Sequence, residues 1–313
     1  MIALSAAELQ KFSQLRLPNV PPGDWNLLFS DDFTSLSLRS GGPTAAGYVA
    51  GSGVWTPRYS WSEVAQGDTH ATENGFNTDP AYAWGGGYPA NGQFLQSGSI
   101  LTIQAQTIPS SLSGKIPTSS RTGLPYPWVT GILQTKNSFT FKAPIFAEAR
   151  MKIPKGISLW PAFWMYAVTG GLTTEIDVIE QLNTQTNQYI ATLHWGPDAS
   201  PVQIDGGWLS RPLDLSLAYH NYGVLWQGGQ FIFFCDRQPV WTYSQPAAWD
   251  DTYMYLLLDL AVGSTAAWTG LDPDGTTPNP AQLLIDWVKV WGTGATPWAS
   301  PPSYVPTYEL LGF

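Results

Sequence analysis

Three carboxylates lie within six residues in the segment Glu175–Glu180 (EIDVIE). The surrounding residues favour a strand, in which strict alternation would put Glu175 and Asp177 on one face and Glu180 on the other. A one-residue bulge at Val178-Ile179 would return Glu180 to the shared face, and bulges are frequent beside active sites. We therefore predict three carboxylates in line on one face of a sheet.

This arrangement fits glycoside hydrolysis, in which one carboxylate attacks the anomeric carbon and another protonates the leaving oxygen. On a straight strand, the Cα atoms of Glu175 and Glu180 would be about 13 Å apart, whereas retaining chemistry needs carboxyl groups about 5–5.5 Å apart. Strand curvature and the long side chains must close this gap. Asp177 would share a proton or hydrogen bond with Glu175, which separates the pKa values of acid and base. A calcium site or a solvated acidic strand face would show the same spacing.

The composition favours a carbohydrate ligand. The 313 residues include 16 Trp, and Trp offers a flat apolar face and a polar N–H to a sugar ring. The net charge of −9 disfavours a nucleic-acid partner, and no apolar run reaches the roughly 18 residues of a membrane span. A single cysteine, Cys235, and three scattered histidines exclude an intrachain disulfide framework and an HExxH zinc site. We expect no cofactor to be required for catalysis.

The chain divides into three parts. Residues 1–24 predict an N-terminal helical extension, since Ser5 and Glu8 form a capping-box pattern, and residues 295–313 form a Pro-rich extension. Residues 25–294 contain many short strand-like runs separated by Gly and Pro, which indicates an antiparallel β-sandwich or jelly roll. The expected strands are 100–105, 129–135, 145–151, 163–168, 174–181, 189–195, 222–226, 231–235, 240–243, 254–262 and 283–291. Long loops at 61–93, 106–128 and 263–282 contain aromatic residues, which favours a functional role.

Taken together, residues 25–292 resemble glycoside hydrolase family 16. The segment EIDVIE matches the bulged form of the family's catalytic motif, and Trp160–Trp164 (WPAFW) matches an aromatic element that precedes it. Further matching segments follow in the family's order at 219–226, 259–263 and 284–290. The resemblance implies an all-β, concanavalin-like jelly-roll sandwich, whose concave sheet forms a polysaccharide cleft.

The resemblance also implies roles for individual residues. Glu175 would be the nucleophile, Asp177 its assistant and Glu180 the acid/base. The expected substrate-binding residues are Trp160, Trp164, His194, Trp195, Asn74, Trp84 and Trp268. A structural role for His194 is an equal alternative, and Glu148 and Arg150 could form an ion pair or touch substrate. Relatives often bind one structural calcium ion, for which Asp286 and the turn Asp31-Asp32-Phe33 are the candidates.

We expect an endo-acting, retaining β-glycosidase that cleaves a β-linked glucan or a glucan-containing bacterial exopolysaccharide. The segment Trp55–Trp61 and the loop after it are more similar to exopolysaccharide-cleaving bacterial enzymes, including succinoglycan depolymerases, than to laminarin- or lichenan-specific ones. A transglycosylase and a non-catalytic sugar-binding jelly roll are the alternatives. The substrate suggests an extracellular or periplasmic location, although the N-terminus lacks the pattern of a signal peptide. We expect a monomer, because the sequence has no coiled-coil heptads and no apolar arm beyond the N-terminal helix.

Overall fold

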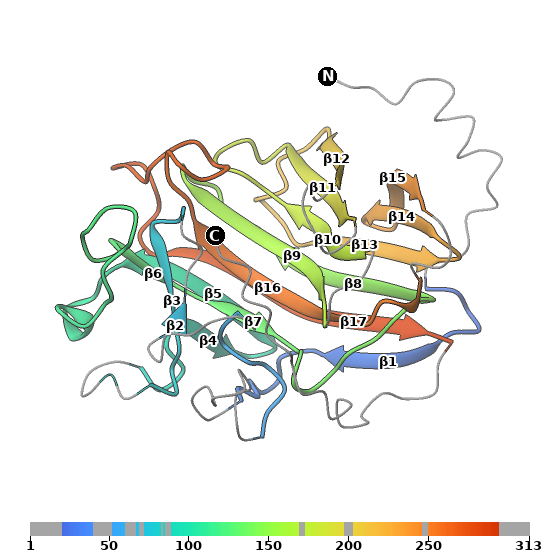
Figure 1. The fold of residues 1–313 in the computed structure, drawn as a ribbon, viewed down its shortest axis with the longest axis horizontal. Coiled ribbons are helices and arrows are strands. Elements are labelled where there is room, and N and C mark those ends of the chain that lie inside the picture. The colour runs from blue at the N-terminus through green and yellow to red at the C-terminus, as the bar shows by residue number, and fades with distance from the viewer. Residues whose placement is uncertain are drawn as a thin grey trace.

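The computed structural model describes residues 21–39, 52–59, 67–68, 72–82, 84, 89–168, 173–196, 203–245 and 250–293. Within these residues two sheets pack face to face as an antiparallel jelly-roll sandwich, which confirms the predicted fold (Figure 1). The described residues contain one short 3-10 helix, Ser110–Leu112, and no helix long and apolar enough to cross a membrane. The extension predicted at 295–313, and nearly all of the helical extension predicted at 1–24, lie outside the described residues.

The first sheet has six strands, in the order β12-β11-β10-β9-β16-β7. Their bounds are Gln203–Ser210 for β12, Gln188–Trp195 for β11, Thr173–Glu180 for β10, Leu159–Ala167 for β9, Met254–Val262 for β16 and Ile132–Gln134 for β7. Every neighbouring pair in this sheet is antiparallel.

The second sheet has eleven strands, in the order β15-β14-β13-β8-β17-β5-β6-β3-β2, with β1 also paired to β17 and β4 to β5. The bounds are Asn26–Asp31 (β1), Gly67–Asp68 (β2), Gly75–Thr78 (β3), Phe94–Ser97 (β4), Ile100–Thr107 (β5), Trp128–Thr130 (β6), Ile145–Lys152 (β8), His220–Gln227 (β13), Gln230–Cys235 (β14), Gln238–Ser244 (β15) and Ala281–Gly292 (β17). The pair β3 and β6 is parallel.

The main hydrophobic core fills the space between the sheets, and alternation decides which residues enter it. On β11, Tyr189, Ala191 and Leu193 belong to the core cluster. Ile190 and Thr192 alternate with them and therefore point to the opposite face of the six-stranded sheet. We call this opposite face, which carries Asp177 opposite Thr192, the cleft face.

Most strands predicted from the sequence are present within a few residues of their expected bounds. The hairpin of β14 and β15 turns on Asp236 and Arg237, which both have positive φ, as a tight two-residue hairpin turn requires. Strand β12 was not predicted, because Gly206-Gly207 interrupts its pattern and glycine weakens a strand signal. Strands β1 to β4 were also missed, since they are short or lie within a segment interpreted as a loop.

A buried ion pair holds together two of the segments at the cleft. Arg58 Nε donates to Asp79 Oδ2 at 2.9 Å, and both side chains are almost completely buried. The pair thereby connects residues 52–59, which end at Tyr59, to residues 72–82, which include Glu73. Both Tyr59 and Glu73 line the cleft described next.

Candidate active site

The bulge expected in β10 is present. Ile176 and Asp177 pair in regular order with Leu193 and Thr192 of β11, and the register then shifts between Asp177 and Glu180. The pairing with β9 shifts at the same place. The consecutive residues Val178 and Ile179 both join the core, so the next side chain returns to the cleft face. Glu175, Asp177 and Glu180 consequently line one cleft of about 270 Å³.

A histidine from the neighbouring strand approaches two of these carboxylates. His194 of β11 lies directly opposite Glu175, and its Nε2 is 3.0 Å from Asp177 Oδ2 and 3.9 Å from Glu175 Oε1. Asp177 and Glu175 are also hydrogen-bonded to each other. The predicted group therefore forms a continuous polar chain from His194 through Asp177 to Glu175.

Burial raises the pKa of all three carboxyl groups. It brings the pKa of Glu175 to about 8, with a further rise from the charge of Asp177 and an opposing effect of His194. Burial also raises the pKa of Asp177 to about 8. The pKa of Glu180 lies well above its usual range because of burial first and the charges of Asp177 and Glu175 second. Since three neighbouring carboxylates cannot all ionise cheaply, the site retains protons near neutral pH.

The two oxygens of Glu180 have different surroundings. Oε1 accepts a 3.0 Å hydrogen bond from Trp160 Nε1. Oε2 is buried and has no hydrogen-bond partner among the described residues. The unpartnered oxygen is the natural position for a proton that a ligand could receive.

Alternate residues of β9 form an aromatic wall of the cleft. Trp160, Ala162, Trp164 and Tyr166 all line it, as the period of two predicts for one face of a strand. Trp164 Nε1 donates to Asp259 Oδ1 of β16 at 2.7 Å, which fixes the orientation of its indole. Two of the predicted sugar-binding residues, Trp160 and Trp164, are therefore placed beside the carboxylates.

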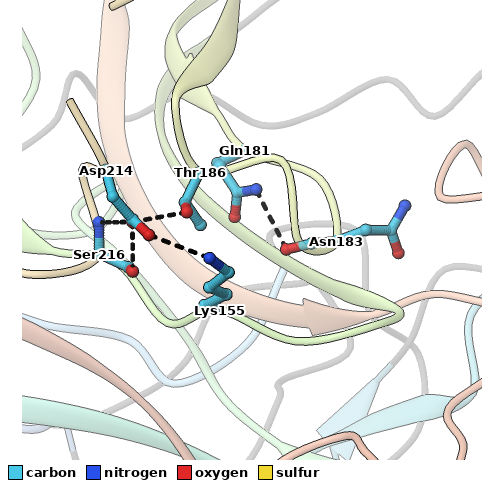
Figure 2. A network of polar contacts seen from close by, with 6 residues as sticks. All are labelled: Lys155, Gln181, Asn183, Thr186, Asp214 and Ser216. Atoms are coloured by element: carbon cyan, nitrogen blue, oxygen red, sulfur yellow. Dashed lines mark hydrogen bonds and ion pairs between the residues drawn. The ribbon is translucent and has the colours of Figure 1, made fainter. Parts of the chain in front are cut away.

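The chain immediately after Glu180 is anchored by polar contacts. Gln181 Nε2 donates to the carbonyl oxygen of Leu182 at 2.8 Å. It also donates to the carbonyl oxygen of Asn183 at 3.2 Å, the contact drawn in Figure 2. Asn183 Oδ1 accepts from Ser158 N at 2.6 Å, and its Nδ2 donates to Thr269 O at 3.0 Å. These bonds fix the end of β10 relative to the start of β9 and to the loop 263–280.

A second cluster in Figure 2 holds the following turn. Asp214 accepts hydrogen bonds from Thr186 and Ser216 and forms an ion pair with Lys155, whose Nζ is 3.0 Å away. These bonds stabilise its carboxylate and hold the pKa of Asp214 far below its usual range, the hydroxyls of Ser216 and Thr186 contributing most. The segment that connects β10 to β11 is thereby tied to the segment after β12.

Asn74 connects three loops. Its Oδ1 accepts from Arg121 Nη2 at 2.6 Å, and its Nδ2 donates to Asp272 Oδ1 at 2.8 Å. Its backbone N–H also donates to Val262 O. The side-chain amide of Asn74 is therefore hydrogen-bonded to loop residues, whereas the adjacent Glu73 lines the cleft.

The remaining predicted sugar-binding residues lie in different surroundings. Trp268 is 50% exposed and packs edge-on against Trp160, with ring centroids 5.9 Å apart. Trp84 is buried in a separate hydrophobic cluster with Phe76 and donates to Asp79 O, so it supports a loop and does not line the cleft. Trp195 follows His194 on β11, and alternation directs it to the face opposite that of His194.

Glu148 and Arg150 of β8, in the other sheet, form ion pairs with other residues and not with each other. Glu148 is fully buried and accepts from Arg237 Nη2 at 3.0 Å, and Arg150 forms an ion pair with Asp286. Neither Glu148 nor Arg150 lines the cleft. The Asp286 carboxylate is thus committed to a guanidinium, and Asp31 accepts from Trp55 Nε1 and Phe33 N. This donor set does not fit a cation site, and the structural calcium ion stays an untested prediction.

The chain belongs to the glycosyl hydrolases family 16, whose sequence model matches residues 92–289. It is 31% identical to the endo-1,3-1,4-beta-glycanase EglC of Rhizobium meliloti (strain 1021) over 85% of this chain, and 29% identical to ExsH, an endo-1,3-1,4-beta-glycanase of the same organism, also over 85%. Each alignment covers 52% of the relative, so the chain spans about half the length of these proteins.

Solved structures show the same fold. The endo-beta-1,3-glucanase from Pyrococcus furiosus aligns with a TM-score of 0.61 at 23% identity, covering 87% of this chain and 95% of that one. This similarity confirms the jelly-roll architecture predicted from the short strands.

Four cleft residues with polar or aromatic side chains were not among the predicted site residues: Tyr59, Glu73, Tyr166 and Asp259. Two of them had a signal in the sequence. Asp259 is the only acidic residue in the apolar run Met254–Val262, and Tyr166 continues the alternation of Trp160 and Trp164. Tyr59 and Glu73 reach the cleft through loop conformations, which periodicity does not predict.

Proposed function

We propose that this protein is an endo-acting β-glucanase that hydrolyses its substrate with retention of anomeric configuration. The observation that carries the proposal is the β10 bulge, which brings Glu175, Asp177 and Glu180 into one Trp-lined cleft. The EglC and ExsH relatives are named endo-1,3-1,4-beta-glycanases, which supports a polymer with β-1,3 and β-1,4 linkages as the substrate. The proposal of a glucan-containing exopolysaccharide rests on the segment Trp55–Trp61 and the loop after it.

Glu175 is the proposed nucleophile. Its side chain is 27% exposed, whereas that of Asp177 is 3% exposed, so a negative charge costs less on Glu175. The hydrogen bond between the two groups by itself favours the proton on Glu175, because it raises the pKa of Glu175 and lowers that of Asp177. For the attack the shared proton has to move to Asp177, which then donates the hydrogen bond to the ionised Glu175. His194, when protonated, stabilises the same charge from β11.

Glu180 is the proposed acid and base. Its raised pKa keeps a proton on the buried Oε2, while Trp160 holds Oε1 in place. In the first step Glu175 attacks the anomeric carbon, and Glu180 gives its proton to the leaving oxygen as the glycosidic bond breaks. In the second step Glu180 takes a proton from water, and the resulting hydroxide displaces Glu175 and restores both carboxyl groups.

The test combines product stereochemistry with a nucleophile variant. NMR during hydrolysis of mixed-linkage β-1,3-1,4-glucan is expected to show the β-anomer first. Glu175→Gln is expected to lower kcat by at least about 1,000-fold while glucan binding survives. Asp251→Asn, which alters an exposed carboxylate of the ion pair with Lys142, is the matched control and keeps full activity.

Initial formation of the α-anomer, or full activity of Glu175→Gln, would contradict this mechanism. Transfer products that predominate over hydrolysis when a sugar acceptor is added would instead identify a transglycosylase, because both reactions share the glycosyl-enzyme step.

A further inference from the structure

An exposed tryptophan lies on the cleft face, away from the carboxylates. Trp208 of β12 is 40% exposed, although β12 belongs to the sheet that carries the site. The next residue, Leu209, packs against the main core, so alternation directs Trp208 to the cleft face. Single exposed apolar residues are ordinary on protein surfaces, and the position of this residue is therefore what matters.

The strand register places Trp208 in line with Glu180. Glu180 of β10 pairs with Ile190 of β11, and Ile190 pairs with Trp208 of β12. The three residues form a row across the strands, in which the Cα atoms of the outer two are roughly 10 Å apart at two strand spacings. Ile190 is 3% exposed, so neighbouring side chains cover this position between Glu180 and Trp208.

A second row of paired residues crosses the same three strands at Asp177 and ends on β12 at a residue without a side chain. Asp177 pairs with Thr192, and Thr192 pairs with Gly206, which has no side chain. Trp208 therefore stands beside a position that carries no side chain, and its own side chain is 40% exposed.

The cleft is asymmetric about β10. Its wall residues Tyr59, Trp164, Tyr166 and Asp259 belong to β9, β16 and the loops on that side. No residue of β11 or β12 in the described part of the chain lines the cleft. A polymer cut at an internal bond has to continue past the carboxylates in both directions, so one arm leaves the cleft over β11 and β12.

We propose that Trp208 is a distal sugar-binding platform for this outgoing arm of the polysaccharide. The inference rests on the proposed function, and the occupant is the same glucan chain that the carboxylates cut. A pyranose ring presents an apolar C–H face that packs on an indole, and an edge strand lets the sugar approach without displacing other side chains. Trp208 would therefore increase the affinity of the protein for long substrates and have no effect on the binding of short ones.

The test compares substrates of different length. Trp208→Ala is expected to raise KM for polymeric mixed-linkage glucan about tenfold with little change in kcat, because it removes binding that is equal in the ground and transition states. Hydrolysis of a short oligosaccharide that reaches only the carboxylate subsites is expected to remain at the level of the unaltered protein. Trp208→Phe, which keeps an aromatic face, is expected to recover most of the polymer affinity.

Two further variants control for folding and for general loss of aromatic surface. Trp208→Thr keeps a strand-favouring residue at the edge and replaces Trp208→Ala if that protein fails to fold. Trp287→Ala removes a half-buried tryptophan from β17 of the other sheet, where Lys289 lies over its ring, and is expected to leave both KM values unchanged.

Unchanged KM for the polymer in the Trp208→Ala and Trp208→Thr proteins, with the unaltered protein active, would overturn the platform alone. An equal loss on polymer and short oligosaccharide would also overturn it, because that result indicates damage to the catalytic centre. Absence of glucan cleavage by the unaltered protein would overturn the proposed function and the platform with it.

Discussion

The indole N–H of Trp160 donates a 3.0 Å hydrogen bond to Glu180 Oε1 from the neighbouring strand. The same indole packs edge-on against Trp268. An aromatic side chain that lines the cleft therefore also orients a carboxyl group and favours its charged form, which lowers the pKa of Glu180 relative to burial alone. In the proposed function, Trp160 would therefore couple sugar binding to proton transfer by Glu180.

Trp160→Phe separates these two roles, because phenylalanine keeps an aromatic face and loses the N–H. We expect kcat to fall about tenfold. The alkaline limb of the kcat/KM profile should move to higher pH, since loss of the hydrogen bond raises the pKa of Glu180 further. Trp287→Phe on the other sheet is the control. An unchanged pH profile would show that the hydrogen bond has no electrostatic effect on the acid.

The substitution His194→Ala should affect the acidic limb of the pH profile. His194 Nε2 lies 3.9 Å from Glu175 Oε1, and its positive charge lowers the pKa of Glu175. Its removal makes Glu175 harder to ionise, so the acidic limb of the kcat profile is expected to shift to higher pH, with about a tenfold loss of rate near neutrality. His220→Gln, which alters a histidine paired with Asp236 on the other sheet, should leave the limb in place. A loss of rate without this shift would assign His194 a purely structural role.

Asp177→Asn tests the energetic cost of the buried carboxyl group. Folding raises the pKa of Asp177 from its ordinary value near 3.8 to about 8, so the folded protein holds a proton that the unfolded chain releases. The contribution of Asp177 to stability is therefore complete below about pH 4 and is lost as the pH rises to about 8. We expect the Tm of Asp177→Asn to exceed that of the unaltered protein by a few degrees at about pH 9 and by less at about pH 4. Thermal unfolding across this range measures it, and a constant difference in Tm would contradict the shift.

Asn183→Gly tests the anchor that follows Glu180. Asn183 has φ of 58°, which glycine adopts without strain, so the substitution removes the side-chain bonds to Ser158 and Thr269 and little else. We expect a loss of about 1–3 kcal/mol in the free energy of unfolding, together with reduced kcat as the end of β10 loosens. Asn183→Asp keeps the acceptor for Ser158 N and should lose less. Equal stability of Asn183→Gly and the unaltered protein in denaturant would contradict the anchor.

Asp79→Ala tests the buried ion pair. Removal of the carboxylate takes the opposite charge away from the buried Arg58 guanidinium, which is expected to cost about 3–5 kcal/mol in the free energy of unfolding. The double variant Arg58→Met/Asp79→Leu, which replaces both charges by apolar groups, should recover most of this loss. Urea unfolding measures both. If the double variant is no more stable than Asp79→Ala, the cost arises from lost packing or lost loop contacts.

The residue pattern predicted the geometry of the strand that carries the three carboxylates. Three acids in a strand-forming segment fit one face only with a bulge, and the bulge occurs at Val178-Ile179 because both apolar side chains enter the core. Trp160 and Trp164 were predicted as neighbours of the site from the resemblance of WPAFW to an aromatic element of the family, and the structure places both on β9 with their side chains on one face. The prediction of the bulge depends on local geometry, which the order of residues determines directly.

The tertiary structure decided which loop and edge residues meet the site. Asn74 and Trp84 are residue types that often bind sugars. Asn74, however, is hydrogen-bonded to Arg121 and Asp272, and Trp84 is buried in a separate hydrophobic cluster. Glu73 reaches the cleft through the path of its loop. Trp208 reaches the cleft face because the edge strand β12 pairs with β11 in this register. Contacts between segments far apart in the chain depend on strand register and loop closure, which come from packing of the whole sandwich, whereas alternation along one strand is encoded by neighbouring residues.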